Sequence, residues 1–195
     1  SRLVFAACGG AMGWVIGGAT ADHLLVVEPG PGKESLVDGG PWRFSRKVGR
    51  PAASPLERAR LALSGPLGLS ASEAVYFIAR TDEDGRLLRS ACHYMISGER
   101  IDSRWWSLTV YDALTFRYVS GHDGRASWAS VAPPLAGGGP WTITVGPEPG
   151  NAPWISSRNE PPGPLELLLR VYGPSKALRE RLPRLPLPTI RRTEC

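Results

Sequence analysis

Few residues of this 195-residue chain combine the types and the spacing that chemistry needs. Ser120, His122 and Asp123 bring together a nucleophile, a base and an acid, the residue types of a hydrolytic triad. Triads draw their members from separated segments, because neighbours in sequence rarely point at one another. We therefore interpret this stretch as a turn and keep Ser120 and His122 only as a weak catalytic alternative. The chain has no serine with glycines two residues away on both sides, so a nucleophile elbow is absent.

Two other groups of reactive side chains are weaker still. Cys92 and His93 are adjacent, so on a strand they face opposite sides and cannot act as a nucleophile–base pair. Asp82, Glu83 and Asp84 lack the alternating spacing and the closing glutamate of a calcium loop, and we expect them to form a solvated hairpin tip. We assign no catalytic residue, no metal site and no cofactor, and we favour a non-enzymatic function over the hydrolase alternative.

The cysteines leave one question open. Cys8, Cys92 and Cys195 are too few and too scattered for a zinc site or a disulfide framework. A single bridge between Cys92 and Cys195 is compatible with an oxidising compartment, but pairing cannot be derived from sequence, so a bridge and two free thiols both remain.

The first 23 residues carry the longest apolar segment. Residues 3–21 hold no charged side chain, and as a helix they would span roughly 28 Å, close to the roughly 30 Å thickness of a bilayer core. We predict a single transmembrane helix over residues 1–23, in a bacterial inner membrane, with a cytoplasmic N-terminus and a periplasmic domain. A cleavable signal peptide, a buried glycine-rich core helix and a lipoprotein signal at Cys8 are the alternatives.

Small residues recur along one face of this predicted helix. They let another helix approach closely, an arrangement known as a glycine zipper. The helix-packing positions that we identify are Ala6, Gly9, Gly10, Gly13 and Gly17. We expect the partners to be subunits of an inner-membrane complex, or further copies of this chain.

The net charge of +5 is concentrated in two segments, residues 43–60 and residues 176–195. Basic side chains near a membrane are attracted to anionic lipid, at about 1 kcal/mol each, so an anionic lipid surface is a second expected partner. No helix-turn-helix, finger or aromatic RNA-binding motif accompanies the charge, so we expect no nucleic-acid binding.

The rest of the sequence predicts an all-β domain. A Pro/Gly-rich linker over residues 24–41 leads into a folded domain that begins at Trp42, with one helix over residues 54–64. Alternating and β-branched stretches predict strands at 74–81, 86–98, 104–112, 141–147 and 165–174, and a weaker one at 125–131. We expect the first two strands to pair as a hairpin and the tail from about residue 176 to lie extended on the surface. This pattern is typical of a β-sandwich or jelly roll.

Tryptophans supply the candidate contact surface of the domain. Trp105 and Trp106 are neighbours on a strand and face opposite sides. We expect one in the core and the other either under a second layer or in an apolar contact surface. We include Trp128 and Trp154 among the candidate contact residues.

Five stretches, in this order, carry a resemblance to a known family: GGPWR (39–43), RARLALSGPLGL (58–69), EAVYFIARTDEDGRLL (73–88), RWWSLTVYD (104–112) and GPLELLLRVYGP (163–174). Together they resemble the small membrane-anchored members of the family called domain of unknown function 1214. The resemblance implies an all-β, jelly-roll-like fold behind one membrane helix, and no agreed activity.

The chain departs from this family pattern in two places. ALTFRYVSGHDG (113–124) stands where the family has a longer loop with proline and asparagine, and NAPWISS (151–157) replaces a compact Asn-Trp-Leu-Pro turn. A ligand pocket that these segments line in relatives would be altered here.

Three functional hypotheses follow. The first is a non-catalytic accessory or structural subunit that packs into an inner-membrane complex through its glycine-rich helix face. The second is a periplasmic binding module for an apolar or lipid-like ligand. The third is a hydrolase.

Overall fold

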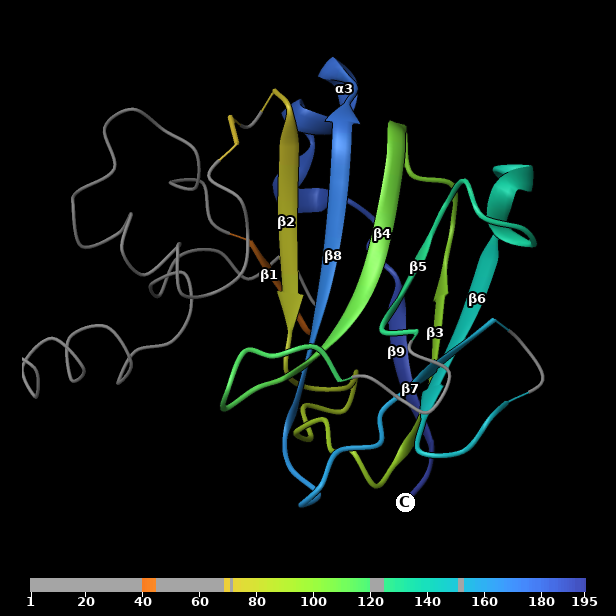
Figure 1. Cartoon of the computed structure of the whole chain (residues 1–195). Coiled ribbons are helices and arrows are strands. Elements are labelled where there is room, and N and C mark those ends of the chain that lie inside the picture. The colour runs from red at the N-terminus through yellow and green to blue at the C-terminus, as the bar shows by residue number, and fades with distance from the viewer. Residues whose placement is uncertain (1–39, 45–68, 71, 120–124, 151–152) are drawn as a thin grey trace, which may run out of the picture.

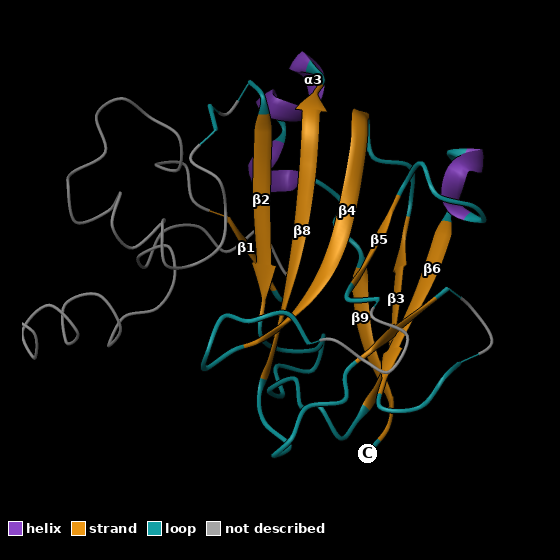
Figure 2. Cartoon of the chain, in the orientation of Figure 1, coloured by secondary structure: helices purple, strands orange, loops and turns teal. Residues whose placement is uncertain are grey.

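The computed structural model describes residues 40–44, 69–70, 72–119, 125–150 and 153–195 (Figure 1). Strands are the main regular secondary structure of this part of the chain, and the helical pieces are short (Figure 2). The predicted all-β fold is confirmed, and the described residues include one short α-helix, which the sequence did not predict.

One sheet has five strands, all of them antiparallel to their neighbours. In spatial order they are β1 (Trp42–Phe44), β2 (Ala74–Ala79), β8 (Leu165–Pro174), β4 (Ser103–Asp112) and β5 (Ser127–Ala129). The long strands β8 and β4 pair over most of their length and form the centre of this sheet.

The other sheet has four strands and one parallel pair, β6 with β7. In spatial order they are β7 (Trp154–Ser156), β6 (Trp141–Gly146), β3 (His93–Gly98) and β9 (Thr189–Glu194). The helical pieces are α3 (Lys176–Glu180) and the 3-10 turns η1 (Leu135–Gly137) and η2 (Leu182–Arg184).

The main core lies between the two sheets. Alternate residues of each strand point inward, so Leu167 and Leu169 of β8 meet Ile143 of β6 and Ile96 of β3 in one buried cluster. Two tryptophan rings close part of this space, because Trp106 and Trp141 lie with their centroids 4.3 Å apart. The inner faces are filled by packed side chains.

The predicted hairpin is present at its turn and wrong beyond it. Around the antiparallel bridge between Thr81 and Leu87, the Leu88 amide donates to the Arg80 carbonyl and the Asp82 amide to the Arg86 carbonyl, both at 2.9 Å. The pairing stops there, because β3 pairs with β6 and β9 in the other sheet. Asp82 is 2% exposed, whereas Glu83 and Asp84 are exposed, so the tip is only partly solvated. The reason is that the Asp82 carboxylate turns inward, toward backbone amides of its own turn and toward Arg192 of β9.

The expected extended tail was also wrong in part. Ser175 caps α3, since its Oγ accepts from the Leu178 amide at 3.0 Å, and Leu178 is buried. Further along, β9 joins the four-stranded sheet as an edge strand, and its Ile190 is fully buried. These apolar anchors fold back a segment whose prolines had suggested a surface-bound extension.

Three expectations fall outside the described residues: the transmembrane helix over residues 1–23, residues 24–39 of the linker, and the helix over residues 54–64. Within the residues that the structure describes, no helix has the length and apolar character needed to cross a membrane.

Candidate functional site

Polar and aromatic side chains gather on the outward side of the five-stranded sheet. β8 alternates, so that its leucines at odd positions enter the core while its polar residues point outward. We call the outward side chains of β2, β8 and β4 the Arg170 face, which comprises Tyr76, Ile78, Trp105, Ser107, Thr109, Tyr111, Glu166, Leu168, Arg170 and Tyr172. Most of these side chains are buried, in contrast to the solvated outer side that a sandwich ordinarily presents.

Arg170 lies at the centre of this face. Strand register places it between Tyr76 of β2 and Ser107 of β4. Its guanidinium donates to Thr109 Oγ1 at 2.8 Å through Nη1 and to the Tyr111 hydroxyl through Nη2, and it lies 5.5 Å from the centroid of the Tyr111 ring. Both acceptors are neutral, and Arg170 has no ion pair with a carboxylate of the described residues.

The Tyr76 hydroxyl is the second unusual group. Tyr76 is 5% exposed, and its hydroxyl has no hydrogen-bond partner among the described residues. Burial raises the pKa of Tyr76 to about 12, with a further increase from Tyr172, although the positive charge of Arg170 opposes both effects. The phenol is therefore protonated at neutral pH and is a donor without an acceptor.

A buried ion pair occupies one end of the Arg170 face. Arg80 Nε donates to Glu166 Oε2 at 2.6 Å, and the Glu166 side chain is 2% exposed. Burial raises the pKa of Glu166, while the charge of Arg80 and its hydrogen bond act in the opposite direction. Since the Glu166 carboxylate pairs with Arg80, it does not neutralise Arg170.

Aromatic rings flank the arginine. Trp105 stacks on Tyr172 with 4.0 Å between centroids at the end of the face away from Glu166, and both are half-buried. Tyr111 stacks on Tyr118 with 4.8 Å between centroids at the same end as Glu166. Burial raises the pKa of Tyr111 to about 12, and its hydrogen bond with Tyr118 adds to the increase. The Arg170 face can thus offer cationic and hydroxyl donors between aromatic surfaces.

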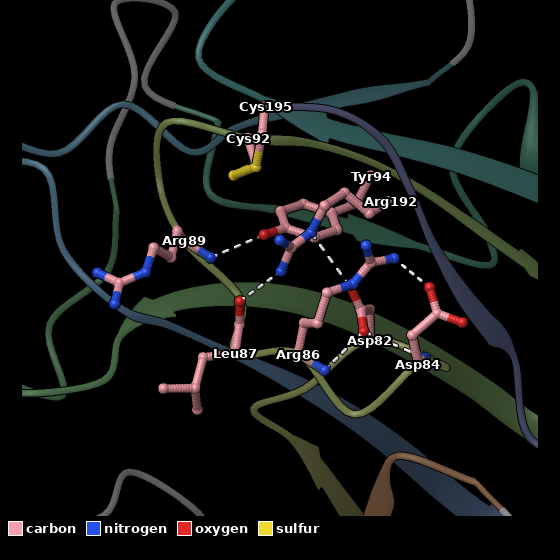
Figure 3. Close-up of polar contacts among 9 residues, drawn as sticks. All are labelled: Asp82, Asp84, Arg86, Leu87, Arg89, Cys92, Tyr94, Arg192 and Cys195. Atoms are coloured by element: carbon pink, nitrogen blue, oxygen red, sulfur yellow. Dashed lines mark hydrogen bonds and ion pairs between the residues drawn. A yellow bond between two sulfur atoms is a disulfide. The ribbon is translucent and has the colours of Figure 1, made fainter.

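A second polar cluster connects the C-terminal strand to the segment after β2 (Figure 3). The buried Asp82 carboxylate accepts from the backbone amides of Asp84 at 3.1 Å and Arg86 at 2.9 Å. It also lies 3.1 Å from Arg192 Nε of β9, and Arg192 Nη2 donates to the Leu87 carbonyl at 2.6 Å. The Asp82 oxygens are fully engaged, so we interpret this cluster as structural.

A disulfide links Cys92, directly before β3, to Cys195 at the end of β9, and Figure 3 shows it beside the Asp82 cluster. The sequence left this pairing open. The bridge leaves Cys92 without a thiol. The His93 imidazole packs against Gly146, where the Cβ of any other residue would collide with the ring.

The candidate contact tryptophans do not form one surface. Trp106 is 4% exposed and belongs to the core, whereas Trp105 joins the Arg170 face, as the alternation predicted. Trp128 and Trp154 lie elsewhere, joined by a hydrogen bond of 2.8 Å from Trp128 Nε1 to the Trp154 carbonyl, and the Arg125 guanidinium stacks 4.1 Å from the Trp128 ring centroid.

The remaining candidates are outside the described residues. These are Ala6, Gly9, Gly10, Gly13 and Gly17 of the helix-packing face and Ser120 and His122 of the catalytic alternative. Over the described ranges, no three histidine, cysteine or acidic side chains come together as metal ligands.

Sequence reasoning missed Arg170, Tyr76 and Glu166. A signal was present in the strand LELLLRVYGP, because Glu166 and Arg170 share the parity of Tyr172 while every inward position is apolar. Two charged residues on one side of a central strand indicate a face with its own polar function or its own covering layer.

Similarity to known proteins is confined to fold and family. The structure resembles the VPA0106 protein from Vibrio parahaemolyticus, with a TM-score of 0.57 at 20% identity over 81% of this chain and 40% of the other. A protein from Burkholderia cenocepacia gives a TM-score of 0.41 at 15% identity over 68% of this chain and 33% of the other. This chain thus spans well under half the length of either protein. No curated protein matches it in sequence. A family profile described as protein of unknown function (DUF1214) matches residues 73–176.

Proposed function

This chain belongs to the DUF1214 family of proteins of unknown function, and we propose that it is a membrane-anchored, non-catalytic accessory protein whose β-sandwich lies in the periplasm. The observation that carries the proposal is the disulfide between Cys92 and Cys195. Disulfides of this kind form and persist in oxidising compartments and are rare in the cytosol. The apolar, charge-free stretch over residues 3–21 supports an anchor of membrane-spanning length.

The location of the domain can be tested by amine labelling. The Lys176 side chain is 84% exposed, so it is open to reagents in solution. We expect a membrane-impermeant amine reagent to modify Lys176 in intact spheroplasts, as read by peptide mass spectrometry, while a cytoplasmic control protein stays unmodified. Modification of Lys176 only after lysis would contradict a periplasmic domain.

The accessory role rests on the glycine-rich face of the anchor. Gly9, Gly13 and Gly17 share one side of a helix, where any side chain would hold a neighbouring backbone away. We expect Gly13→Ile to leave membrane insertion intact, because it adds apolar surface, and to abolish co-purification of partner subunits or self-association. Val4→Ile, on another face, is the matched control. Equal association of wild type and Gly13→Ile would refute the packing role.

A periplasmic binding module is the second candidate function, and the Arg170 face favours it. Among the described residues, packed side chains such as Trp106 and Trp141 occupy the space between the sheets. The uncompensated charge of Arg170 and the unpartnered hydroxyl of Tyr76 support the outward face of the five-stranded sheet as the site for such a ligand. An apolar or lipid-like molecule would then lie on this face.

A further inference from the structure

We propose that the Arg170 face binds an amphiphilic carboxylate, whose head group lies between the Arg170 guanidinium and the Tyr76 hydroxyl and whose apolar body lies against the half-buried Trp105–Tyr172 stack. The inference rests on the binding function proposed above and names the ligand class of that site.

Among the described residues, the guanidinium of Arg170 has N–H donors that no acceptor uses and a positive charge that no carboxylate balances. Of its five N–H groups, one is used by Thr109 and one by Tyr111, both neutral hydroxyls. The groups that face Arg170 from β2 and β4 are hydroxyls, and on β8 the Glu166 carboxylate is engaged by Arg80. A half-buried arginine in this setting is matched by an external anion, which gains strength from the low local dielectric.

The Tyr76 hydroxyl is an independent sign of a missing acceptor. Buried hydroxyls are nearly always hydrogen-bonded, and this one has no described partner at 5% exposure. Tyr76 and Arg170 are directly opposite each other in the register of β2 with β8, and the charge of Arg170 acts on the Tyr76 phenol. One ligand oxygen pair can therefore accept from both side chains.

Charge and surroundings select the ligand class. Arg170 is the single uncompensated cation among the described residues of this face, so a monoanion neutralises it, whereas a dianionic phosphate would leave one negative charge unpaired. A carboxylate presents two acceptor oxygens in the geometry that the arginine fork recognises. Beside this polar centre, the half-buried Trp105–Tyr172 stack offers a flat aromatic surface for the apolar body of the ligand.

The test is a titration of the purified, oxidised full chain in detergent with octanoate, octyl phosphate and octanol, followed by calorimetry and by tryptophan fluorescence. We expect octanoate to bind saturably and octyl phosphate and octanol to bind at least about tenfold more weakly. Octyl phosphate carries excess negative charge, and octanol carries none. Tighter binding of octyl phosphate would assign the site to phosphates and overturn the carboxylate proposal.

Two substitutions locate the binding. Arg170→Gln should weaken octanoate by about tenfold or more, since it removes the charge. Tyr76→Phe should weaken octanoate by about fivefold while the melting temperature of the free protein stays unchanged or rises, because the hydroxyl it removes has no partner to lose. This second variant keeps the test valid if Arg170→Gln does not fold.

Two matched controls complete the design. Arg191→Gln removes an exposed cation of β9 on the other sheet, and Tyr94→Phe removes a hydroxyl that accepts from the Arg89 amide at 2.8 Å. Both should bind octanoate like the wild type. No saturable octanoate binding, or equal affinity in the wild type, Tyr76→Phe and Arg170→Gln, would overturn the proposal. Either result would leave the periplasmic location, which is tested by Lys176 labelling, untouched.

Discussion

Removal of the disulfide should destabilise the domain without changing its native structure. Cys92 and Cys195 are 103 positions apart, so the bridge closes a loop that includes seven of the nine described strands, from β3 to β9. In the chain-entropy account, a loop of this size lowers the stability of the unfolded state by about 4.7 kcal/mol. For a chain of this length, that corresponds to a fall in melting temperature of roughly 10–20 °C.

The native state should survive because β9 has other anchors. Ile190 is fully buried, Arg192 contacts the Asp82 carboxylate, and the Pro188 carbonyl accepts from Trp42 Nε1 at 2.6 Å. The effect of the bridge is then exerted mainly through the unfolded chain.

The assay compares Cys8→Ser with the triple variant Cys8→Ser/Cys92→Ser/Cys195→Ser by circular dichroism and thermal denaturation. Spectra at 20 °C should coincide, and only the first protein should lose stability when a reductant is added. A difference in melting temperature below about 3 °C would refute the reasoning, because it would show that the loop closure contributes little.

Three further perturbations test the packing and the electrostatics. Trp106→Ala should cost about 3–5 kcal/mol in urea denaturation because it empties the core, whereas Trp105→Ala, on the half-buried outer stack, should cost less than half as much. Arg192→Gln should lower the free energy of unfolding by about 3 kcal/mol, because the buried Asp82 carboxylate then keeps only the more exposed Arg86 as its cationic partner. An unchanged urea midpoint would mean that Arg86 alone balances the charge of Asp82. Burial alone would raise the pKa of Asp112, but hydrogen bonds from Thr115, Leu114 and Asn159 lower it below its ordinary value. The Asp112 carboxylate therefore stabilises the fold above its ordinary pKa, and this stabilisation is lost as the pH falls through the lowered pKa. Asp112→Asn should therefore cost about 1.5–3 kcal/mol at pH 7, with the two unfolding curves converging in acid; a pH-independent difference would contradict this assignment.

The longer strands could be predicted because their signal is local. Residues 104–112 and 165–174 alternate or are rich in β-branched and apolar residues, and they became β4 and β8 almost to the residue. The central pairing of β4 with β8, about sixty residues apart in sequence, needed no special motif, since both carry an apolar face of similar length.

Strand partners were less predictable than strands. The turn at Asp82–Gly85 indicated a hairpin, yet the following segment crosses to the other sheet because Leu88 and Cys92 are drawn into the core and Tyr94 accepts from the Arg89 amide. The strands β1 and β7 have three residues each, too few for an alternation to be recognised, and β9 has Ile190 as its single apolar residue. Tertiary contacts decide the conformation of all three.

The candidate site depended on pairing as well. Arg170 and Tyr76 are separated by more than ninety residues, and only the register of β2 with β8 brings them together. The disulfide has the same character, since nothing in the spacing of three cysteines selects Cys92 with Cys195.

The redox state of these two cysteines in living cells is the most direct test of the proposed periplasmic role. Cells that produce the full chain are quenched in acid, free thiols are blocked with a maleimide, and the protein is then reduced and labelled with a second, heavier reagent. The account predicts that Cys92 and Cys195 take up only the second label in nearly all molecules. Uptake of the first label at both positions in most molecules would show a reduced domain and would contradict an oxidising, extracytoplasmic location.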